Sequence, residues 1–98
     1  MVPRDLIVEV IARRVAKAEG VDVEQMRRSG QGRKESEARL ITAWLGREVG
    51  RISTAKAAKY FGRDTSTISR GLVRLEERMD SDRALRDRVS RLSKQVGP

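Results

Sequence analysis

The stretch from residue 53 to residue 79, STAKAAKYFGRDTSTISRGLVRLEERM, decides the fold of this chain. Ser53 or Thr54 can cap a short helix that ends near residues 60–61, and Gly62 can make a tight turn. A longer helix follows the turn. Its apolar side chains recur in steps of four, three and four, and they are Ile68, Leu72, Leu75 and Met79. Two helices of these lengths around a glycine turn have the spacing of a helix-turn-helix.

The N-terminal part of the chain also has helical periodicity. A first helix is expected between Pro3, which suits a first turn, and Gly20, which suits a helix end. Asp22 can cap a short second helix that runs through Met26, and residues 27–34 are expected to form a basic loop with two glycines. The expected apolar face of the first helix consists of Leu6, Ile7, Val10, Ile11 and Val15.

A third helix is expected from about Glu35 to Gly50, a residue type common just past a helix end. Trp44 flanks its apolar face, and the last helix repeats the same periodicity. The apolar residues are Ala38, Ile41 and Leu45 in the third helix, and Leu85, Val89, Leu92 and Val96 in the last. No stretch alternates apolar and polar residues as a strand does. The sequence therefore predicts one all-α domain over residues 1–98, a small helical domain of about six helices with a helix-turn-helix.

Two neighbouring residues of the longer helix bear on how it packs. Leu72 lies in the middle of the apolar face and is expected to be buried against the third and fourth helices. Gly71 inside a helix costs about 1 kcal/mol relative to alanine. We therefore expect Gly71 to approach a neighbouring helix or a binding partner closely, or else to be merely tolerated.

Composition excludes several classes of protein. The 98 residues include three aromatic side chains and no cysteine, so no disulfide or thiolate metal site can form. The chain has no run of about 18 apolar residues, as a membrane span requires, and its start does not resemble a signal peptide. We expect a cytoplasmic protein.

The charge points to a polyanionic partner. Twenty-two Lys and Arg residues against fourteen Asp and Glu residues give a net charge of +8. Between Lys56 and Arg74 there are five basic residues and one acidic residue, Asp64. Cations that neutralise phosphates release counterions from nucleic acid, and this release drives binding.

The longer helix begins TSTISR at residue 65, after a cap expected at residues 64–66. Small hydroxyl side chains let the helix start approach base edges, and arginines such as Arg70 and Arg74 can bind guanine or phosphate. The N–H groups of a helix N-terminus can also donate to phosphate oxygens. Each feature alone is typical of a helix cap or a solvated charge. Together, beside a glycine turn in a basic stretch, they favour contact with DNA.

Residues 61–69, FGRDTSTIS, resemble the signature F-G-x-R-D-H-[ST]-T-V of the C-terminal DNA-binding domain of the bacterial replication initiator DnaA. The likeness extends over nearly the whole chain, from the opening helix to the closing one. Similar domains follow the catalytic domain of some transposases that act on repetitive extragenic palindromes. Residues 36–39 and 74–78 resemble the transposase-linked domains more than the initiator domain. The resemblance implies sequence-specific binding to duplex DNA, in replication initiation or as the targeting module of a transposase.

The resemblance also implies roles for individual residues. The start of the longer helix would meet the edge of the major groove, the start of the shorter helix would touch phosphates, and the basic loop would approach the minor groove. The residues carried over are Asp64, Thr65, Ser66, Thr67, Arg70 and Arg74 for the longer helix, Arg63 for the turn, Ser53, Thr54 and Lys56 for the shorter helix, and Arg33, Lys34 and Arg39 for the loop.

Three departures from the family pattern change the recognition chemistry. Thr65 stands where the family usually has histidine, one glycine precedes Arg63 where many initiators have two, and Glu37 falls near an expected minor-groove arginine. The recognition sequence of the initiator therefore does not carry over to this chain.

Other functions are less favoured by the sequence. Histidine is absent and there is no P-loop motif, so we expect no catalytic site, no cofactor, no metal and no small-molecule substrate. Two alternatives stay open: a basic RNA-binding module and a protein-interaction module that uses the last helix. The basic residues of that helix are Arg83, Arg86, Arg88, Arg91 and Lys94. We expect duplex DNA as the partner of a monomeric domain associated with the nucleoid.

Overall fold

The computed structural model describes residues 4–28 and 32–96, and this part consists of six helices without a strand. The helices are α1 (Arg4–Glu19), α2 (Val23–Arg27), α3 (Arg33–Glu48), α4 (Thr54–Tyr60), α5 (Thr65–Ser81) and α6 (Arg83–Val96). The prediction of an all-α fold with about six helices is confirmed. The expected opening residue Pro3 lies outside the described residues.

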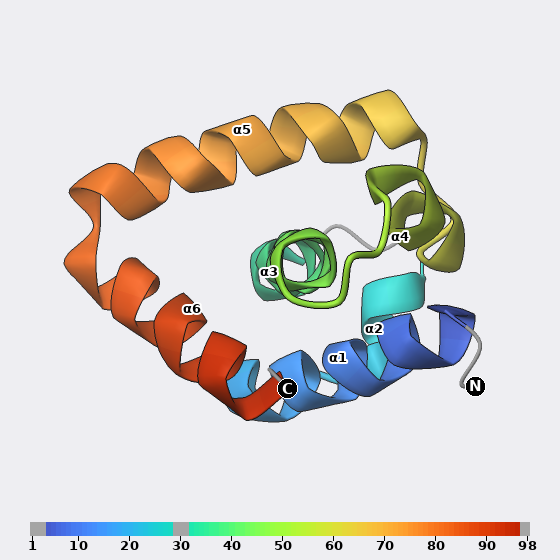
Figure 1. Cartoon of the computed structure of the whole chain (residues 1–98), viewed down its shortest axis with the longest axis horizontal. Helices are drawn as coiled ribbons and strands as arrows, with labels where there is room; N and C mark the ends of the chain where they lie inside the picture. Colours follow the sequence, from blue (N-terminus) through green and yellow to red (C-terminus); the bar gives the residue numbers. More distant parts are fainter. Residues whose placement is uncertain (1–3, 29–31, 97–98) are drawn as a thin grey trace.

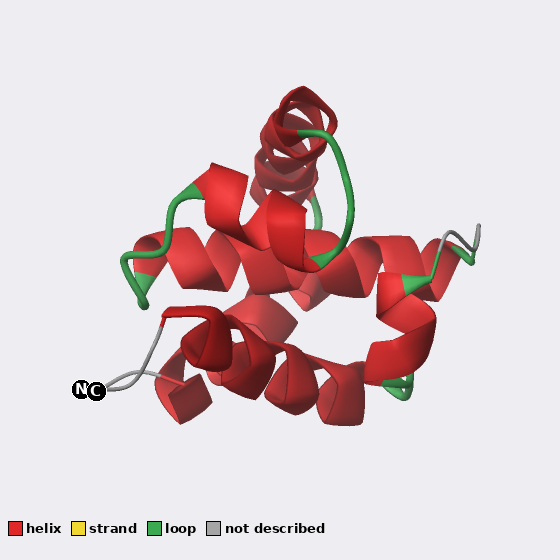
Figure 2. Ribbon diagram, turned by 90° about the vertical axis from the view of Figure 1, so that its right-hand side faces the viewer, coloured by secondary structure: helices red, strands yellow, loops and turns green. Residues whose placement is uncertain are grey.

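Helix α3 lies in the middle of the molecule and contacts each of the other five helices. In Figure 1 it is seen end-on, with α5, α6 and α1 on three sides and α4 and α2 on the fourth. The side view in Figure 2 shows helices joined by short loops. No helix in the described residues is long and apolar enough to cross a membrane. Because the other five helices surround α3, a candidate functional site is expected on these outer helices and on the exposed start of α3.

The central place of α3 follows from its sequence. Ala38, Ala43 and Gly46 are buried on it, and small side chains let neighbouring helices approach closely. Thr42 is also buried, and its hydroxyl donates a hydrogen bond to the Ala38 carbonyl at 2.8 Å. Burial of this residue therefore leaves its side-chain oxygen partnered within α3.

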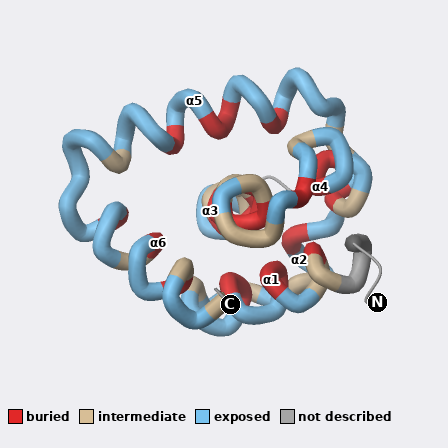
Figure 3. The backbone as a smooth tube through the Cα atoms, viewed as in Figure 1, coloured by how far each residue is buried: buried red, intermediate tan, exposed pale blue. Residues whose placement is uncertain are grey.

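The apolar faces predicted for α3, α5 and α6 are those that point inward (Figure 3). Leu72 is 1% exposed, as expected from its place in the periodicity. In α1 the prediction was partly wrong, because Val10 is 54% exposed. It lies on the far side of α1 from the buried face, which consists of Val8, Ile11, Ala12, Val15 and Ala16. The side chain of Leu6 lies outside the described part.

One predicted boundary of α3 differs from the structure, and the other is confirmed, because α3 ends at Glu48 with Val49 as its C-cap and Gly50 is the first residue beyond that cap. Helix α3 begins at Arg33 and not near Glu35, so the basic loop is shorter than expected. Gly50 does not take the left-handed conformation, which Arg51 takes instead with φ 55°. A Cβ atom on Gly50 would lie 3.2 Å from both the Gly46 carbonyl oxygen and the Ile52 Cδ1 atom. A side chain at residue 50 would therefore require these neighbours to shift by a few tenths of an ångström.

Gly71 faces a neighbouring helix, one of the two close approaches expected for it. A Cβ atom at this position would lie 2.5 Å from the Leu40 Cδ2 atom of α3. Without a side chain at residue 71, the backbone of α5 can approach α3 as closely as the Leu40 side chain allows. This contact helps to fix the distance between α5 and α3.

We expect Gly71→Ala to change the free energy of unfolding little, because the gain in helix propensity of about 1 kcal/mol is offset by displacement of Leu40. In a Leu40→Ala background the space is open, so the same change should raise stability by about 1 kcal/mol. Urea unfolding of the four variants measures the coupling between the two sites. An equal effect of Gly71→Ala in both backgrounds contradicts the assigned contact.

Candidate nucleic-acid interface

Helix α4 presents two lysines to solvent. Ser53 is its N-cap, and the Ser53 hydroxyl accepts a hydrogen bond from the Lys56 N–H at 3.1 Å. Thr54, the first residue of α4, is half-buried, whereas Lys56 and Lys59 are exposed. Lys59 was not among the predicted site residues, although its spacing of three from Lys56 indicates the same face of the helix.

The turn between α4 and α5 is held firmly. Phe61 is fully buried, and Gly62 adopts the left-handed conformation with φ 62° that glycine takes readily. The Arg63 N–H donates to the Ala58 carbonyl at 2.8 Å, which closes the turn on α4. The direction in which α5 leaves α4 is therefore fixed by both packing and hydrogen bonds.

The four polar side chains predicted for the start of α5 are all exposed. They are Asp64, Thr65, Ser66 and Thr67. Asp64 has the extended backbone of an N-cap, yet its carboxylate accepts a hydrogen bond from the Ser66 hydroxyl and none from the N–H groups of α5. Within the described residues, these N–H groups have no side-chain cap. The start of α5 therefore offers both hydroxyl groups and backbone donors to a ligand.

Two adjacent rows of polar and basic side chains run along α5 from its N-terminus. Ser66 and Arg70 lie on its outer face, which Figure 3 shows as exposed. Thr67 and Arg74 line a groove of about 260 Å³ that α5 shares with α3, where Ser36 forms part of the other wall. Arg70 and Arg74 are both exposed, and Arg70 follows Ser66 by about one helical turn while Arg74 follows Thr67 by about two.

Arg39 has a different place from the one expected of a DNA contact. It is 6% exposed, and its guanidinium donates hydrogen bonds to the Met26 carbonyl at 2.9 Å and to the Ser36 hydroxyl at 2.8 Å. Burial lowers the pKa of Arg39, the nearby Arg63 lowers it further, and Glu35 raises it in part. Arg39 therefore ties the end of α2 to α3, and it lines the groove between α3 and α5 together with Thr67 and Arg74.

Arg63 is also used largely within the protein. Its guanidinium donates to the Phe61 carbonyl at 3.0 Å and to the Arg28 carbonyl at 2.8 Å. Arg27 makes a second link in this region, because its Nε donates to the Tyr60 carbonyl at 3.2 Å. Together these two arginines bind the end of α2 to the turn before α5, beside the start of the basic loop.

Tyr60 lies beneath the Arg27 guanidinium, whose carbon is 4.6 Å from the centre of the ring. Burial raises the pKa of the Tyr60 phenol, and the charge of Arg27 partly counteracts this. The hydroxyl has no hydrogen-bond partner within the described residues. Tyr60 therefore serves this region as an apolar ring on which an arginine is stacked.

Glu37, at the place where the family resemblance implies an arginine, joins three helices. Its carboxylate pairs with Arg78 of α5 at 2.7 Å and with Arg88 of α6 at 2.9 Å, and Arg88 also pairs with Glu19 of α1 at 3.2 Å. Burial lowers the pKa of Arg88, but the two carboxylates outweigh this effect and raise it above its ordinary value. Glu37 thus holds the second half of α5.

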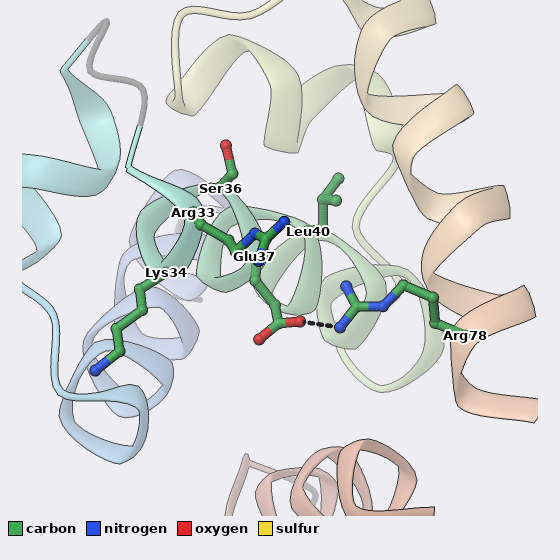
Figure 4. Close-up of a pocket in the computed structure, with 6 residues that line it drawn as sticks. All are labelled: Arg33, Lys34, Ser36, Glu37, Leu40 and Arg78. Atoms are coloured by element: carbon green, nitrogen blue, oxygen red, sulfur yellow. Dashed lines mark ion pairs between the residues drawn. The ribbon is translucent and has the colours of Figure 1, made fainter. Parts of the chain in front are cut away.

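The pair between Glu37 and Arg78 crosses a groove of about 580 Å³ (Figure 4). Arg33 and Lys34, two of the residues predicted for the basic loop, lie on its rim in the first turn of α3, and both are exposed. In Figure 4 the Lys34 side chain points away from the Glu37 carboxylate. Both cations therefore remain at the surface.

The pair that Glu76 makes runs from α5 across to α3. Its carboxylate accepts hydrogen bonds from Arg47 at 3.1 Å and from the Trp44 ring nitrogen at 3.4 Å. The second half of α5 is therefore fixed on both flanks of its apolar face, by Glu76 on one side and by Arg78 on the other.

The described residues contain no cluster of three or more side chains that could hold a metal ion. No protein-family model matches the chain, and a comparison with curated proteins finds no match either. Function has to be argued from the arrangement of α4, α5 and the start of α3.

We expect Arg39→Met to lower the free energy of unfolding by about 1–3 kcal/mol, because the Met26 carbonyl loses a buried donor. Chemical denaturation checks this, with Lys34→Met as the control, since Lys34 is exposed in the same helix. If both variants are as stable as the unchanged protein, the assigned role of Arg39 is wrong.

Proposed function

We propose that this chain binds double-stranded DNA in a sequence-specific manner, with α4 and α5 acting as a helix-turn-helix and the start of α5 in the major groove. The observation that carries the proposal is the first turn of α5. There, exposed hydroxyl groups and uncapped backbone N–H groups lie at the end of a helix whose opposite face is buried. A helix held in this way can present its N-terminal residues to base edges.

The distribution of exposed positive charge supports the same part of the surface as the proposed DNA-binding face. The exposed cations of α4, of the first half of α5 and of the start of α3 are Lys56, Lys59, Arg70, Arg74, Arg33 and Lys34. Side chains of this kind bind phosphates and set the register of a protein on DNA. Arg39 and Arg63 belong to the proposal as residues that position the turn and the loop.

The resemblance of residues 61–69 to the initiator signature supports this function and suggests two biological settings. One is origin binding in replication initiation, and the other is DNA targeting by a transposase, both in the cytoplasm at the nucleoid. The arrangement of α4 and α5 supports DNA binding, which both settings require, and does not favour one setting over the other. Selection of bound duplexes from a random pool is the experiment that separates them, since it reveals the recognised sequence.

The proposal is tested by mobility shifts with duplex DNA, matched duplex RNA and single strands. We expect the tightest binding to duplex DNA. The slope of log K against log salt should be about −4 to −6, because about six cations neutralise phosphates. Lys56→Ala should weaken binding to all DNA duplexes alike.

Arg83→Ala is the matched control, because Arg83 is exposed at the start of α6, beyond the far end of α5. It should leave DNA binding nearly unchanged. A salt slope near zero, or a preference for RNA, contradicts the proposal. A larger effect of Arg83→Ala than of Lys56→Ala would move the interface to α6, the surface on which a protein partner was the alternative.

We expect Asp64→Ala to flatten the preference for one base pair by about 1–3 kcal/mol. The circular dichroism spectrum should stay unchanged, because the Asp64 carboxylate bonds none of the N–H groups of α5. Binding to duplexes that vary at each position measures the preference. Lost helicity together with a uniform loss of affinity would instead assign Asp64 the role of a helix cap.

A further inference from the structure

One apolar side chain lies in the middle of the polar face of α5. Val73 is 58% exposed, and within the described residues the only other large apolar side chain so exposed is Val10 of α1. A β-branched residue lowers helix propensity, and an exposed one gains no burial in return. Neither helix propensity nor burial therefore favours valine at this position.

The position of Val73 relates it to the proposed DNA-contacting residues. It lies seven residues after Ser66, four after Ser69 and three after Arg70, and all three of these are exposed. Residues at i, i+3, i+4 and i+7 share one face of a helix, and a helix in the major groove presents side chains to base edges with this spacing. Val73 is thus the third-turn residue of the same outward face.

The face changes character just beyond Val73. Glu76, Glu77 and Asp80 follow on α5, and all three are exposed. Carboxylates are repelled by phosphates, so the contact with DNA should end before them. Val73 and Arg74 are therefore the last residues of α5 that can lie against a duplex, and Val73 lies about 10 Å along the helix from Ser66.

The chemistry of the major groove offers one apolar feature that suits such a residue. The C5-methyl group of thymine projects into the groove, and apolar side chains recognise it by contact. The other features on the base edges are hydrogen-bond donors and acceptors, which valine cannot match.

We propose that Val73 is a specificity-determining residue that packs against the C5-methyl group of a thymine. This inference rests on the proposed function. It places the thymine on the side of the Ser66 base pair toward which α5 runs, because Val73 lies about 10 Å further along the helix. The bound sequence therefore contains a thymine on that side of the Ser66 base pair.

The test uses a duplex selected from a random pool by the unchanged chain. Each thymine is replaced in turn by deoxyuridine, which removes the C5-methyl group and keeps the base pairing. We expect one replacement to weaken binding about fourfold, the factor that burial of one methyl group gives. Val73→Ala should bind the original duplex about fourfold more weakly and should no longer respond to that replacement.

The variants separate this effect from folding. Val73→Ala should fold at least as well as the unchanged chain, since alanine has the higher helix propensity. Val10→Ala, at the other exposed valine, should bind like the unchanged chain and keep the response to deoxyuridine. Circular dichroism and thermal unfolding of both variants check that the structure is retained.

Several outcomes overturn the inference alone, because duplex binding with a sequence preference persists in all of them. In the first, no thymine replacement affects binding. In the second, Val73→Ala keeps the full response to the replacement. In the third, the sensitive thymine lies on the other side of the Ser66 contact. Loss of any preference for duplex DNA by the unchanged chain overturns the proposed function and this inference together.

Discussion

The burial of α3 on almost every side is the constraint on which the rest of the structure depends. A helix can be surrounded in this way only if its neighbours can approach, and the small residues Ala38, Ala43 and Gly46 permit that. Gly71 extends the same principle to α5, where the Leu40 side chain fills the space that a Cβ atom would take. The orientation of α5, and with it the proposed DNA-facing surface, is set by contacts made on the opposite side of that helix.

Arginine has two separate uses in this chain, which net charge cannot distinguish. Arg39, Arg63 and Arg88 donate to backbone carbonyls or pair with carboxylates between helices. A guanidinium suits this role because it stays charged and presents several donors in one plane. Arg70 and Arg74 are exposed and stay available to phosphates. Some of the basic residues that suggest a nucleic-acid partner thus serve to hold the helices together.

Helical periodicity predicted much of the fold, because each amphipathic helix buries the face that its own spacing defines. The buried residues Ile68, Leu72 and Leu75 of α5 follow from that rule. The rule misplaced Val10, since several apolar residues in α1 allow more than one choice of face. It also gave no means to place Arg39 or Glu37. The reach of a long side chain depends on which carbonyl or carboxylate the tertiary structure brings near it, and this information is not local.

The two halves of α5 carry different chemistry, and the division explains how one helix can serve both fold and partner. The second half holds acidic side chains and is clamped to α3 by Glu76 and Arg78. The first half makes its polar contacts near the turn and leaves its hydroxyl groups and cations exposed. A clamp far from the ligand fixes the direction of a helix without using groups needed for recognition. Because the clamped half carries Glu76, Glu77 and Asp80, it would also limit how far along α5 a polyanion could extend, so Glu76 both holds the helix and lies at the edge of the proposed surface.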